Sequence, residues 1–400
     1  MARCGDGFAA GSDLLRAALD AADQVRAALH GNVPDLACVF VSGSDHAGVE
    51  AALLLAAERV GARTTIGCSA YGVIGSGRAA EAASSVSVWA AYLPGVRLRA
   101  FHLEVLRTSD SIAVVGMPQQ RSDDAVAVLL ADPWSFPADG FVAQSWDALP
   151  GLPLVGGLAY GSRGAGSVRL LLDGRTIERG AVGVLLGGLA PAGIGLLTLV
   201  SQGCRPVGPV MTVTAAEGNV ILELAGVAAL DKLRAVLASL PGREQALVTA
   251  GLQIGVAVDE YAEGQEQGDF LIRGIVGSDE VRGGIAVGDV VEVGRTVRFQ
   301  VRDADAASAD LTSMLTRFRA SGALDPVEGA LLFSCNGRGR AMFGDAAHDG
   351  RLVAAGLGAR SVAGFMSAGE IGPVGGRNHL HGFSASMLLV GDAATAAAPR

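Results

Sequence analysis

The sequence predicts an α/β protein with mixed β-sheets covered by helices, built from repeated strand–helix–strand units. Half of the residues are apolar, the strand–helix–strand order recurs, and each copy carries a Gly-x-x-(Ala/Ser)-x-Gly turn. A chain of 400 residues exceeds one compact core, so we expect two or more domains. Since only 18% of the residues are charged, global disorder is excluded.

The first elements are read from periodicity. Apolar residues at helical spacing predict an N-terminal helix capped by Ser12, and its acidic residues exclude a signal peptide. An apolar strand at 36–41, a helix at about 47–60 and a closing strand at 85–92 follow. A glycine turn interrupts this unit between its helix and its closing strand.

The same order returns twice along the chain. In the second copy the strand is expected at 125–130, followed by a stretch that runs to 149, and the closing strand at 181–186. In the third copy the strand is expected at 330–333, the helix at 348–355 and the closing strand at 383–390. The turns of the three copies are Gly67/Ala70/Gly72, Gly156/Ala159/Gly161 and Gly364/Ser367/Gly369. The stretch 270–277 is expected to be a weaker fourth copy.

One uncharged stretch, Gly180–Cys204, is long enough for a membrane span. Its glycines and the central Pro191 instead favour two buried strands joined by a turn.

Small residues at the glycine turns allow one backbone to approach another, or a ligand. Several such turns meeting in space can line a cleft whose free N–H groups hold an anion. Ordinary loop chemistry in a glycine-rich fold is the alternative interpretation of any single copy.

Charge and cysteine usage narrow the function classes. The net charge is −9 and there is no basic run, which argues against nucleic-acid binding. The five cysteines are widely spaced without a C-x-x-C pair, so reduced thiols are expected rather than disulfides or a zinc site.

The chain resembles the FIST family (F-box and intracellular signal transduction) in its bacterial stand-alone form. The segments similar to the FIST N domain are Gly67–Gly72, Val155–Ala159, Gly203–Gly208 and Ala216–Ile221. Those similar to the FIST C domain are Asp269–Gly274, Gly288–Gly294, Phe299–Asp303, Cys335–Gly339 and Gly364–Gly376, followed by Asn378, His381 and Gly382. The resemblance implies a FIST N domain at 34–225 and a FIST C domain at 226–391. The expected N-terminal helix then occupies 1–33, and a flexible tail is expected at 392–400.

The resemblance also implies a cytoplasmic sensor of small ligands, with amino acids or small carboxylates proposed. Some relatives are haem-based nitric-oxide sensors, which is one alternative here; no cofactor is otherwise expected. Others act with histidine kinases or cyclases. This chain leaves no room for an output domain, so it is expected to signal through a partner protein, without nucleic acid or membrane.

Polar residues beside the turns are the candidate ligand contacts. Arg338, in the Asn336–Gly339 loop after a buried strand, can hold a carboxylate with two hydrogen bonds, or can be a solvent-facing residue of an Asn-Gly turn. Arg205 either faces a pocket or pairs with an acidic neighbour such as Glu217. Glu370 can bind an amine or cap a loop.

The cluster after the third turn completes the candidate site. His379 and His381 alternate, so in a strand they share a face, and His381 alone can be a haem ligand or a hydrogen-bonded structural residue. The full predicted set comprises Gly67, Cys68, Ser69, Gly156, Gly157, Arg205, Asn336, Arg338, Gly369, Glu370, Arg377, Asn378 and His381.

An enzymatic alternative stays open. No G-x-S-x-G, P-loop or H-E-x-x-H pattern appears in the sequence. A nucleophilic Cys68 or Cys335 activated by His381 would make a hydrolase, although the spacing does not require one. Tyr71 and Tyr160 occupy equivalent places in the repeat and can act as acids or fill space.

Overall fold

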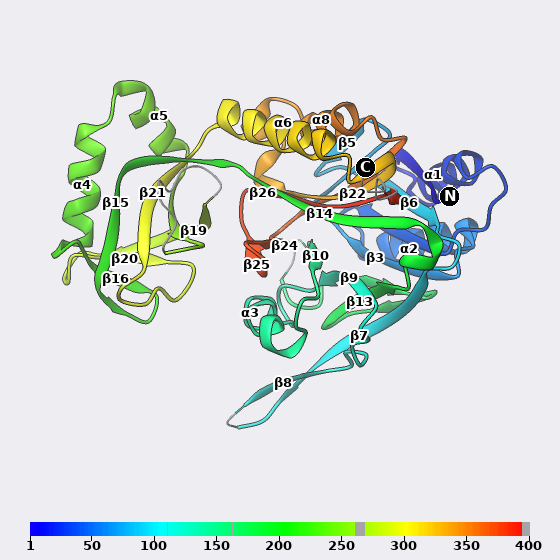
Figure 1. Cartoon of the computed structure of the whole chain (residues 1–400), viewed down its shortest axis with the longest axis horizontal. Coiled ribbons are helices and arrows are strands. Elements are labelled where there is room, and N and C mark those ends of the chain that lie inside the picture. Colours follow the sequence, from blue (N-terminus) through cyan, green and yellow to red (C-terminus); the bar gives the residue numbers. More distant parts are fainter. Residues whose placement is uncertain (110, 162–163, 261–268, 394–400) are drawn as a thin grey trace, which may run out of the picture. The chain divides into compact units, whose positions relative to one another are not determined.

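The computed structural model describes residues 1–109, 111–161, 164–260 and 269–393. The chain divides into two compact units, each described by itself (Figure 1). Unit 1 comprises Met1–Val200, Leu311–Leu380 and the described part of Ser384–Arg400. Unit 2 comprises Ser201–Asp310 and His381–Phe383.

Repeat 1 forms the N-terminal part of unit 1. Its elements are β1 (Arg3–Ala10), α1 (Leu14–Ala28), β2 (Leu36–Ser42), α2 (His46–Val60), β3 (Thr64–Ser69), β4 (Gly72–Gly75), β5 (Arg78–Glu81) and β6 (Ser85–Tyr92). The predicted helices and strands are confirmed, but β1 was not predicted. The expected Ser12 cap is wrong: the carboxylate of Asp13 lies in reach of the first turn and accepts from Arg16 N at 3.0 Å.

Repeat 2 follows with the same order. Its elements are β7 (Arg97–Arg107), β8 (Ile112–Val115), β9 (Asp124–Ala131), α3 (Ala138–Ala148), β10 (Leu154–Leu158), β11 (Leu170–Leu172), β12 (Arg175–Ile177) and β13 (Ala181–Gly187). The uncharged stretch forms β13, the short η1 (Ala190–Ala192) and β14 (Ile194–Gln202). The prediction of two strands and a turn is therefore confirmed. No helix in the described ranges is long and apolar enough to cross a membrane.

Repeat 3 completes unit 1 after the chain has passed through unit 2. Its elements are α6 (Ala304–Ser321), β22 (Leu324–Cys335), η2 (Asn336–Arg338), α7 (Arg340–Phe343), α8 (His348–Leu357), β23 (Ser361–Ser367), β24 (Glu370–Val374), β25 (Arg377–His381) and β26 (Ser384–Ala393). The predicted strand, helix and closing strand are all present. The first seven residues of α6, Ala304–Asp310, are counted with unit 2, although the helix itself is continuous.

The repeats exchange hairpins between three mixed sheets of the described residues. Sheet I has the strand order β1-β6-β2-β3-β11-β12, sheet II β25-β24-β10-β9-β13-β7-β8, and sheet III β14-β26-β22-β23-β4-β5. Each sheet is thus built on the parallel strand pair of one repeat and is extended by a hairpin from another. Hairpin β4–β5 of repeat 1 joins repeat 3, β11–β12 joins repeat 1, and β24–β25 joins repeat 2.

The first glycine of each turn explains how the exchanged hairpins fit. Gly67, Gly156 and Gly364 stand opposite the aliphatic residues Leu171, Ile371 and Ile74 of the incoming strands. An added Cβ would lie 2.2, 1.9 and 1.7 Å from the carbonyl oxygen of the neighbouring parallel strand. The recurrent glycine is therefore required by backbone packing in all three repeats.

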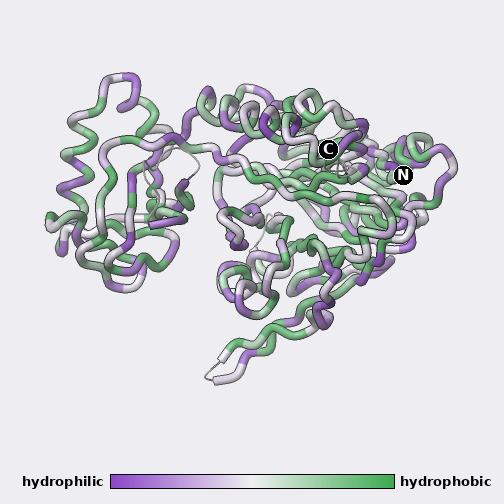
Figure 2. Tube along the Cα trace, in the orientation of Figure 1, coloured by the Kyte–Doolittle hydropathy of each residue, from purple (hydrophilic) through white to green (hydrophobic). Residues whose placement is uncertain are grey.

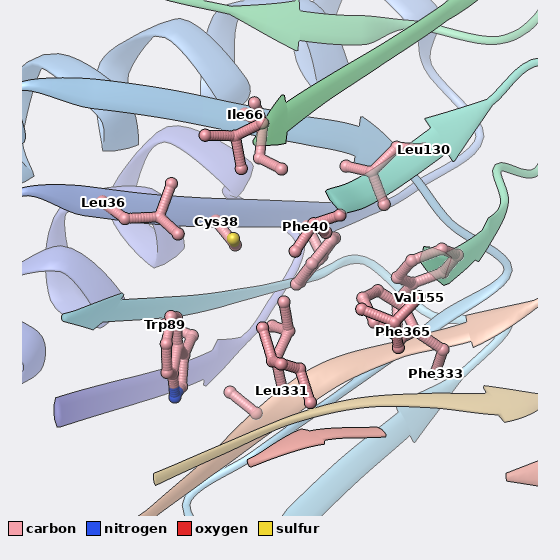
Figure 3. Close-up of a cluster of buried hydrophobic side chains, with 14 of the residues drawn as sticks. Leu36, Cys38, Phe40, Ile66, Trp89, Leu130, Val155, Leu331, Phe333 and Phe365 are labelled. Carbon is pink, nitrogen blue, oxygen red and sulfur yellow. The ribbon is translucent and has the colours of Figure 1, made fainter. Parts of the chain in front are cut away.

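The three sheets meet in one apolar core (Figure 3). Phe40 of β2, Phe333 of β22 and Phe365 of β23 are fully buried there, and the Phe40 and Phe365 ring centroids lie 4.9 Å apart. Leu130 of β9 and Val155 of β10 bring repeat 2 into the same cluster. Helices cover the outer faces: α1 and α2 pack on sheet I, α3 on sheet II, and α6 and α8 on sheet III.

Unit 2 is an antiparallel closed sheet. Its elements are β15 (Cys204–Glu217), β16 (Val220–Leu224), β17 (Val227–Ala228), α4 (Ala229–Ser239), α5 (Gly242–Ala250), β18 (Leu252–Ala257), β19 (Phe270–Asp279), β20 (Gly284–Val287) and β21 (Thr296–Arg302). Strand β15 pairs with both β21 and β16, which closes the sheet around an apolar interior. The expected fourth copy is wrong, because 270–277 lies in β19, between two antiparallel neighbours.

Candidate functional site

A cleft in unit 1 opens where the parallel strands β2 and β3 end. It has a volume of about 220 Å³. Its lining residues come from the ends of β2 and β3, the start of α2, the loop before β6 and the segment before β11: Ser42, Gly43, Ser44, His46, Val49, Ser69, Ala70, Tyr71, Ala82, Ala83, Ser84, Tyr160, Gly161, Ser167 and Arg169. We call this the tyrosine cleft. The carboxyl edge of parallel strands is where α/β folds place ligands.

The glycine turns of repeats 1 and 2 meet at this cleft. Tyr71 and Tyr160 stand at equivalent places in the two turns, and their rings pack edge to face with centroids 5.2 Å apart. Ser69 joins the turns, since its Oγ donates to the Tyr160 carbonyl at 2.9 Å and accepts from Arg169 N at 3.0 Å. Ser42 Oγ donates to the Tyr71 carbonyl at 2.9 Å.

These hydrogen bonds hold the backbone around the cleft in place, and they leave two phenols and one imidazole available for a ligand. The described part of the chain supplies no hydrogen-bond partner for the phenols of Tyr71 and Tyr160 or for the half-buried imidazole of His46. The start of α2 is occupied, because the Asp45 carboxylate accepts from Ala47 N and Gly48 N. The cleft therefore offers phenol and imidazole groups rather than a helix N-terminus.

Arg169 is the cation in the lining, and other groups already engage it. Its Nε donates to Glu50 at 3.0 Å, and its Nη2 lies 3.2 Å from Glu178. Its Nη1 donates to the carbonyls of Gly166 and Val168. A guanidinium held in this way orients the lining but provides little unbalanced positive charge.

A second polar group of residues is buried in repeat 3, at the equivalent end of β22. Arg338 forms two parallel hydrogen bonds to Asp349, at 2.7 Å from Nε and 3.0 Å from Nη2. Ser334 Oγ and His348 Nδ1 donate to the same carboxylate at 2.6 and 2.9 Å. The interpretation of Arg338 as a solvent-facing turn residue is wrong, because its side chain is fully buried.

The environment of this ion pair keeps it charged. Burial by itself would raise the pKa of Asp349, but Arg338 and the hydrogen bonds from its neighbours hold it well below the usual range. Phe343 stacks on the His348 ring at a centroid distance of 3.7 Å and covers the pair. Arg338 therefore binds a carboxylate, as its position suggested, but the carboxylate is the protein's own Asp349.

Glu370 is the second buried acid near this ion pair. Its Oε2 accepts from Ser384 N and Oγ at 3.2 and 2.9 Å, while Oε1 has no hydrogen-bond partner among the described residues. Burial raises the pKa of Glu370 to about 8. Hydrogen bonds from Ser384, the Arg338 charge and the Cys335 thiol act against burial and lower this pKa. The side chain is thus largely protonated near neutral pH.

The sheet register shows how unusual Glu370 is. Glu370 faces Gly157 of β10, just as Leu170 faces Cys68 and Val73 faces Phe365 in the other two exchanged hairpins. Leu170 and Val73 belong to the shared apolar core. A carboxyl group therefore replaces an aliphatic side chain at this one of three equivalent positions.

The glycines and Cys68 of the predicted set have packing roles in this structure. Gly157 and Gly369 lie beside Ser367 and Leu158, where an added Cβ would be 2.4 and 3.0 Å from its nearest neighbour. Cys68 points into the core, and burial raises its pKa well above that of an ordinary thiol. A buried thiol of this kind opposes the hydrolase alternative at Cys68.

Two candidates after the third turn lie away from the tyrosine cleft. Asn378 is buried, accepts from Leu154 N at 2.8 Å and donates to Ser145 and Leu152. It therefore ties β25 to the neighbourhood of α3. The guanidinium of Arg377 lies 4.7 Å from the ring of Trp146.

The remaining candidates belong to unit 2 or to the η2 turn. Arg205 pairs with Asp303 and Glu244, both at 3.0 Å, so its expected pairing with an acidic neighbour is confirmed. The partner is not Glu217, which lies beside Arg282. His381, the last residue of β25, is buried and is counted with unit 2, and its haem role stays a prediction. Asn336 opens η2 and lies 3.8 Å from the Cys335 sulfur.

The predicted ligand contacts therefore do not form one site. Of these residues, Ser69 lines the tyrosine cleft. His46, Ser42 and Arg169 were not predicted as ligand contacts. The equivalence of Tyr71 and Tyr160 was visible in the repeat, but their proximity depends on the exchange of β11–β12 into sheet I.

Comparison of the sequence with models of known families identifies the class of protein to which this three-repeat fold belongs. The model of the FIST N domain matches residues 35–227, and that of the FIST C domain matches residues 229–373. The chain therefore belongs to the FIST family, whose domains are regarded as sensory domains of signal transduction. The boundary between the two family matches lies inside unit 2. The FIST N and FIST C domains therefore do not coincide with the two compact units of the structure.

Mycobacterial relatives cover nearly the whole chain. Uncharacterized protein Rv0628c of Mycobacterium tuberculosis is 43% identical over 391 residues, which span 98% of this chain and 100% of the relative. Uncharacterized protein Mb0898c of Mycobacterium bovis is 41% identical over 392 residues, which span 98% of this chain and 99% of the relative.

Proposed function

We propose that this FIST protein senses a small polar molecule of amino-acid size, which binds in the tyrosine cleft. The observation that carries the proposal is the meeting of two glycine turns at the carboxyl edge of β2 and β3, with the phenols of Tyr71 and Tyr160 available in the cleft lining. Ligand sites are concave and combine apolar walls with a few placed polar groups. Val49, Ala70 and Ala82 supply such walls here.

The size and charge of the cleft favour one ligand class. A volume of about 220 Å³ is below the ~300–1,000 Å³ of sites for drug-sized ligands, so a smaller molecule fits better. Arg169 is already balanced by Glu50 and Glu178. A zwitterionic amino acid or a neutral polar molecule is therefore favoured over a dicarboxylate, which would need unbalanced positive charge.

In this proposal Arg338 and Glu370 do not contact the ligand, in contrast to what the sequence led us to expect. Arg338 already binds Asp349, and both Arg338 and Glu370 are fully buried. Their role in the proposal is to stabilise repeat 3. Transmission of the signal to a partner protein stays part of the proposal.

Thermal-shift screening of amino acids, small monocarboxylates and dicarboxylates tests the proposal. A ligand at 100 times its Kd stabilises by about 2.7 kcal/mol, which raises Tm by several degrees in a domain of this size. Tyr71→Phe/Tyr160→Phe should weaken binding about tenfold or more, since each neutral hydrogen bond contributes ~1 kcal/mol. Tyr92→Phe, outside the cleft, is the matched control.

Two results would count against the proposal. The first is a panel in which no compound raises Tm. The second is a shift that stays equally large in the double variant, because binding would then occur elsewhere. The haem alternative predicts a Soret band that His381→Ala weakens, which is a separate observation.

A further inference from the structure

The β7–β8 hairpin leaves an unusual edge on sheet II. Strand β8 is the last strand of that sheet, and within the described residues its one neighbour is β7. The N–H and C=O groups along its outer side therefore have no partner strand. Figure 1 shows the hairpin extending from the sheet of unit 1.

Both faces of this hairpin expose apolar side chains. Opposite residues of an antiparallel pair share a face, so Val105, Val114 and Ile112 lie on one face beside Arg107 of β7, and Leu106 and Val115 lie on the other beside Glu104 of β7. Ile112, Leu106 and Val115 are 53%, 52% and 41% exposed. An antiparallel ribbon in water usually keeps one face polar, so both faces of this ribbon are incompletely covered. Hydrophobic colouring is visible along the hairpin in Figure 2.

A groove of about 800 Å³ continues the apolar surface from the hairpin to α3. Val114 and Met117 line one wall, and Phe141 and Leu149 line the other. The lining contains no Asp, Glu, Lys or Arg side chain from the described residues. Nothing in the groove therefore selects a charged occupant.

The other edge strands of unit 1 carry the protection that β8 lacks. Strands β1, β5, β12 and β25 each contain a charged residue, and the side chains of β14 are half-buried or buried. Charges, prolines and bulges are the usual means of preventing edge-to-edge pairing. The four residues of β8, Ile112–Val115, contain none of these and pair with β7 in regular register.

We infer that a second copy of the chain covers this edge through antiparallel pairing of β8 with its counterpart. The occupant must supply a free strand edge and uncharged apolar side chains, and β8 itself has both properties. A twofold axis through Ala113 places Ala113 opposite its own copy and Ile112 opposite Val114 of the second copy, so apolar side chains meet and no like charges oppose each other. Such a self-complementary contact is the common form of homodimer interface.

Light scattering coupled to gel filtration tests the inference on the full chain. The mass should rise from 40.3 kDa towards twice that value as the wild-type concentration increases through the micromolar range. Ala113→Lys/Val115→Lys should stay at the single-chain mass, because four like charges would meet across the pairing. Ser109→Lys, near the tip of the same hairpin, is the matched control and should dimerise like the wild type.

A charge-swap mixture sharpens the test. Ala113→Lys and Ala113→Glu should each weaken the dimer at least tenfold alone, and their equal mixture should recover the two-chain mass. An unchanged melting temperature of each variant shows that the fold persists. A wild type that stays monomeric overturns the inference, as does a dimer that survives the double substitution or a mixture that fails to recover it.

Discussion

Glu370 places a titratable group where repeats 1 and 2 have Val73 and Leu170. Its pKa is about 8 in the folded chain against 4.5 for an ordinary glutamate. The folded state therefore holds the proton more tightly than the unfolded state does. Stability is greatest below pH 4.5 and is lost as pH rises towards 8, at up to about 1.4 kcal/mol per pH unit.

The variant Glu370→Gln tests this linkage. It removes the titrating group, so the free energy of unfolding of the variant relative to wild type should increase steadily between pH 4.5 and 8 and level off above. Urea denaturation at several pH values measures it, with the exposed Glu104→Gln as control. A difference that stays constant with pH would show that Glu370 titrates normally in the folded chain.

The Arg338–Asp349 pair leads to a second prediction at this scale. Asp349→Ala should destabilise the chain by about 3–5 kcal/mol, because it leaves the Arg338 charge buried without a counter-ion. The double variant Arg338→Met/Asp349→Leu should recover much of that loss, since it removes both charges together. Chemical denaturation provides the comparison. A single variant that costs under about 1 kcal/mol would mean that water reaches the guanidinium.

The sequence could locate these residues but not their partners. Arg338 follows a buried strand, and from that position we expected it to hold the carboxylate of a small ligand, whereas it pairs with Asp349 of the chain itself. Asp349 lies eleven positions later, in the first turn of α8, and nothing in the spacing identifies it as that partner. The burial of Arg338 also depends on Phe343 and the surrounding sheets. Arg338 is therefore fully enclosed, although its sequence position resembles that of a turn residue.

At the scale of elements, the repeated glycine has a structural purpose that makes a clear prediction. Gly364→Ala should destabilise by about 1–3 kcal/mol or more, because its Cβ would lie 1.7 Å from the Leu332 carbonyl oxygen. Gly140→Ala in α3 meets no atom within 4 Å and should be neutral or stabilising. Thermal melts of the two variants measure the difference. Equal Tm values would contradict the close packing of β22 and β23.

The order of elements followed from periodicity, but their pairing did not. Each strand–helix–strand unit was recognisable because apolar runs, helical spacing and glycine turns are local signals. The exchange of β4–β5, β11–β12 and β24–β25 is a tertiary property, since each hairpin could equally have folded back on its own repeat. Strand β1 escaped prediction because Gly5 and Gly7 interrupt its apolar pattern.

At the scale of the whole molecule, family and architecture divide the chain in different ways. The FIST N and FIST C matches meet between residues 227 and 229, within unit 2. Unit 1 is instead assembled from three repeats, the third of which begins after unit 2 in the chain. The predicted boundary near residue 225 follows the family division, and the tail residues 394–400 lie outside the described part.

Binding of a small polar ligand in the tyrosine cleft of unit 1 can be observed directly at the two tyrosines of the cleft. The chain has four tyrosines, so fluorine NMR of protein labelled with 3-fluorotyrosine gives few resonances, which single Tyr→Phe variants assign. Saturation with a ligand that raises Tm should shift the resonances of Tyr71 and Tyr160 and leave that of Tyr92 unchanged. A bound ligand that leaves both Tyr71 and Tyr160 unshifted would show that the ligand binds outside the tyrosine cleft.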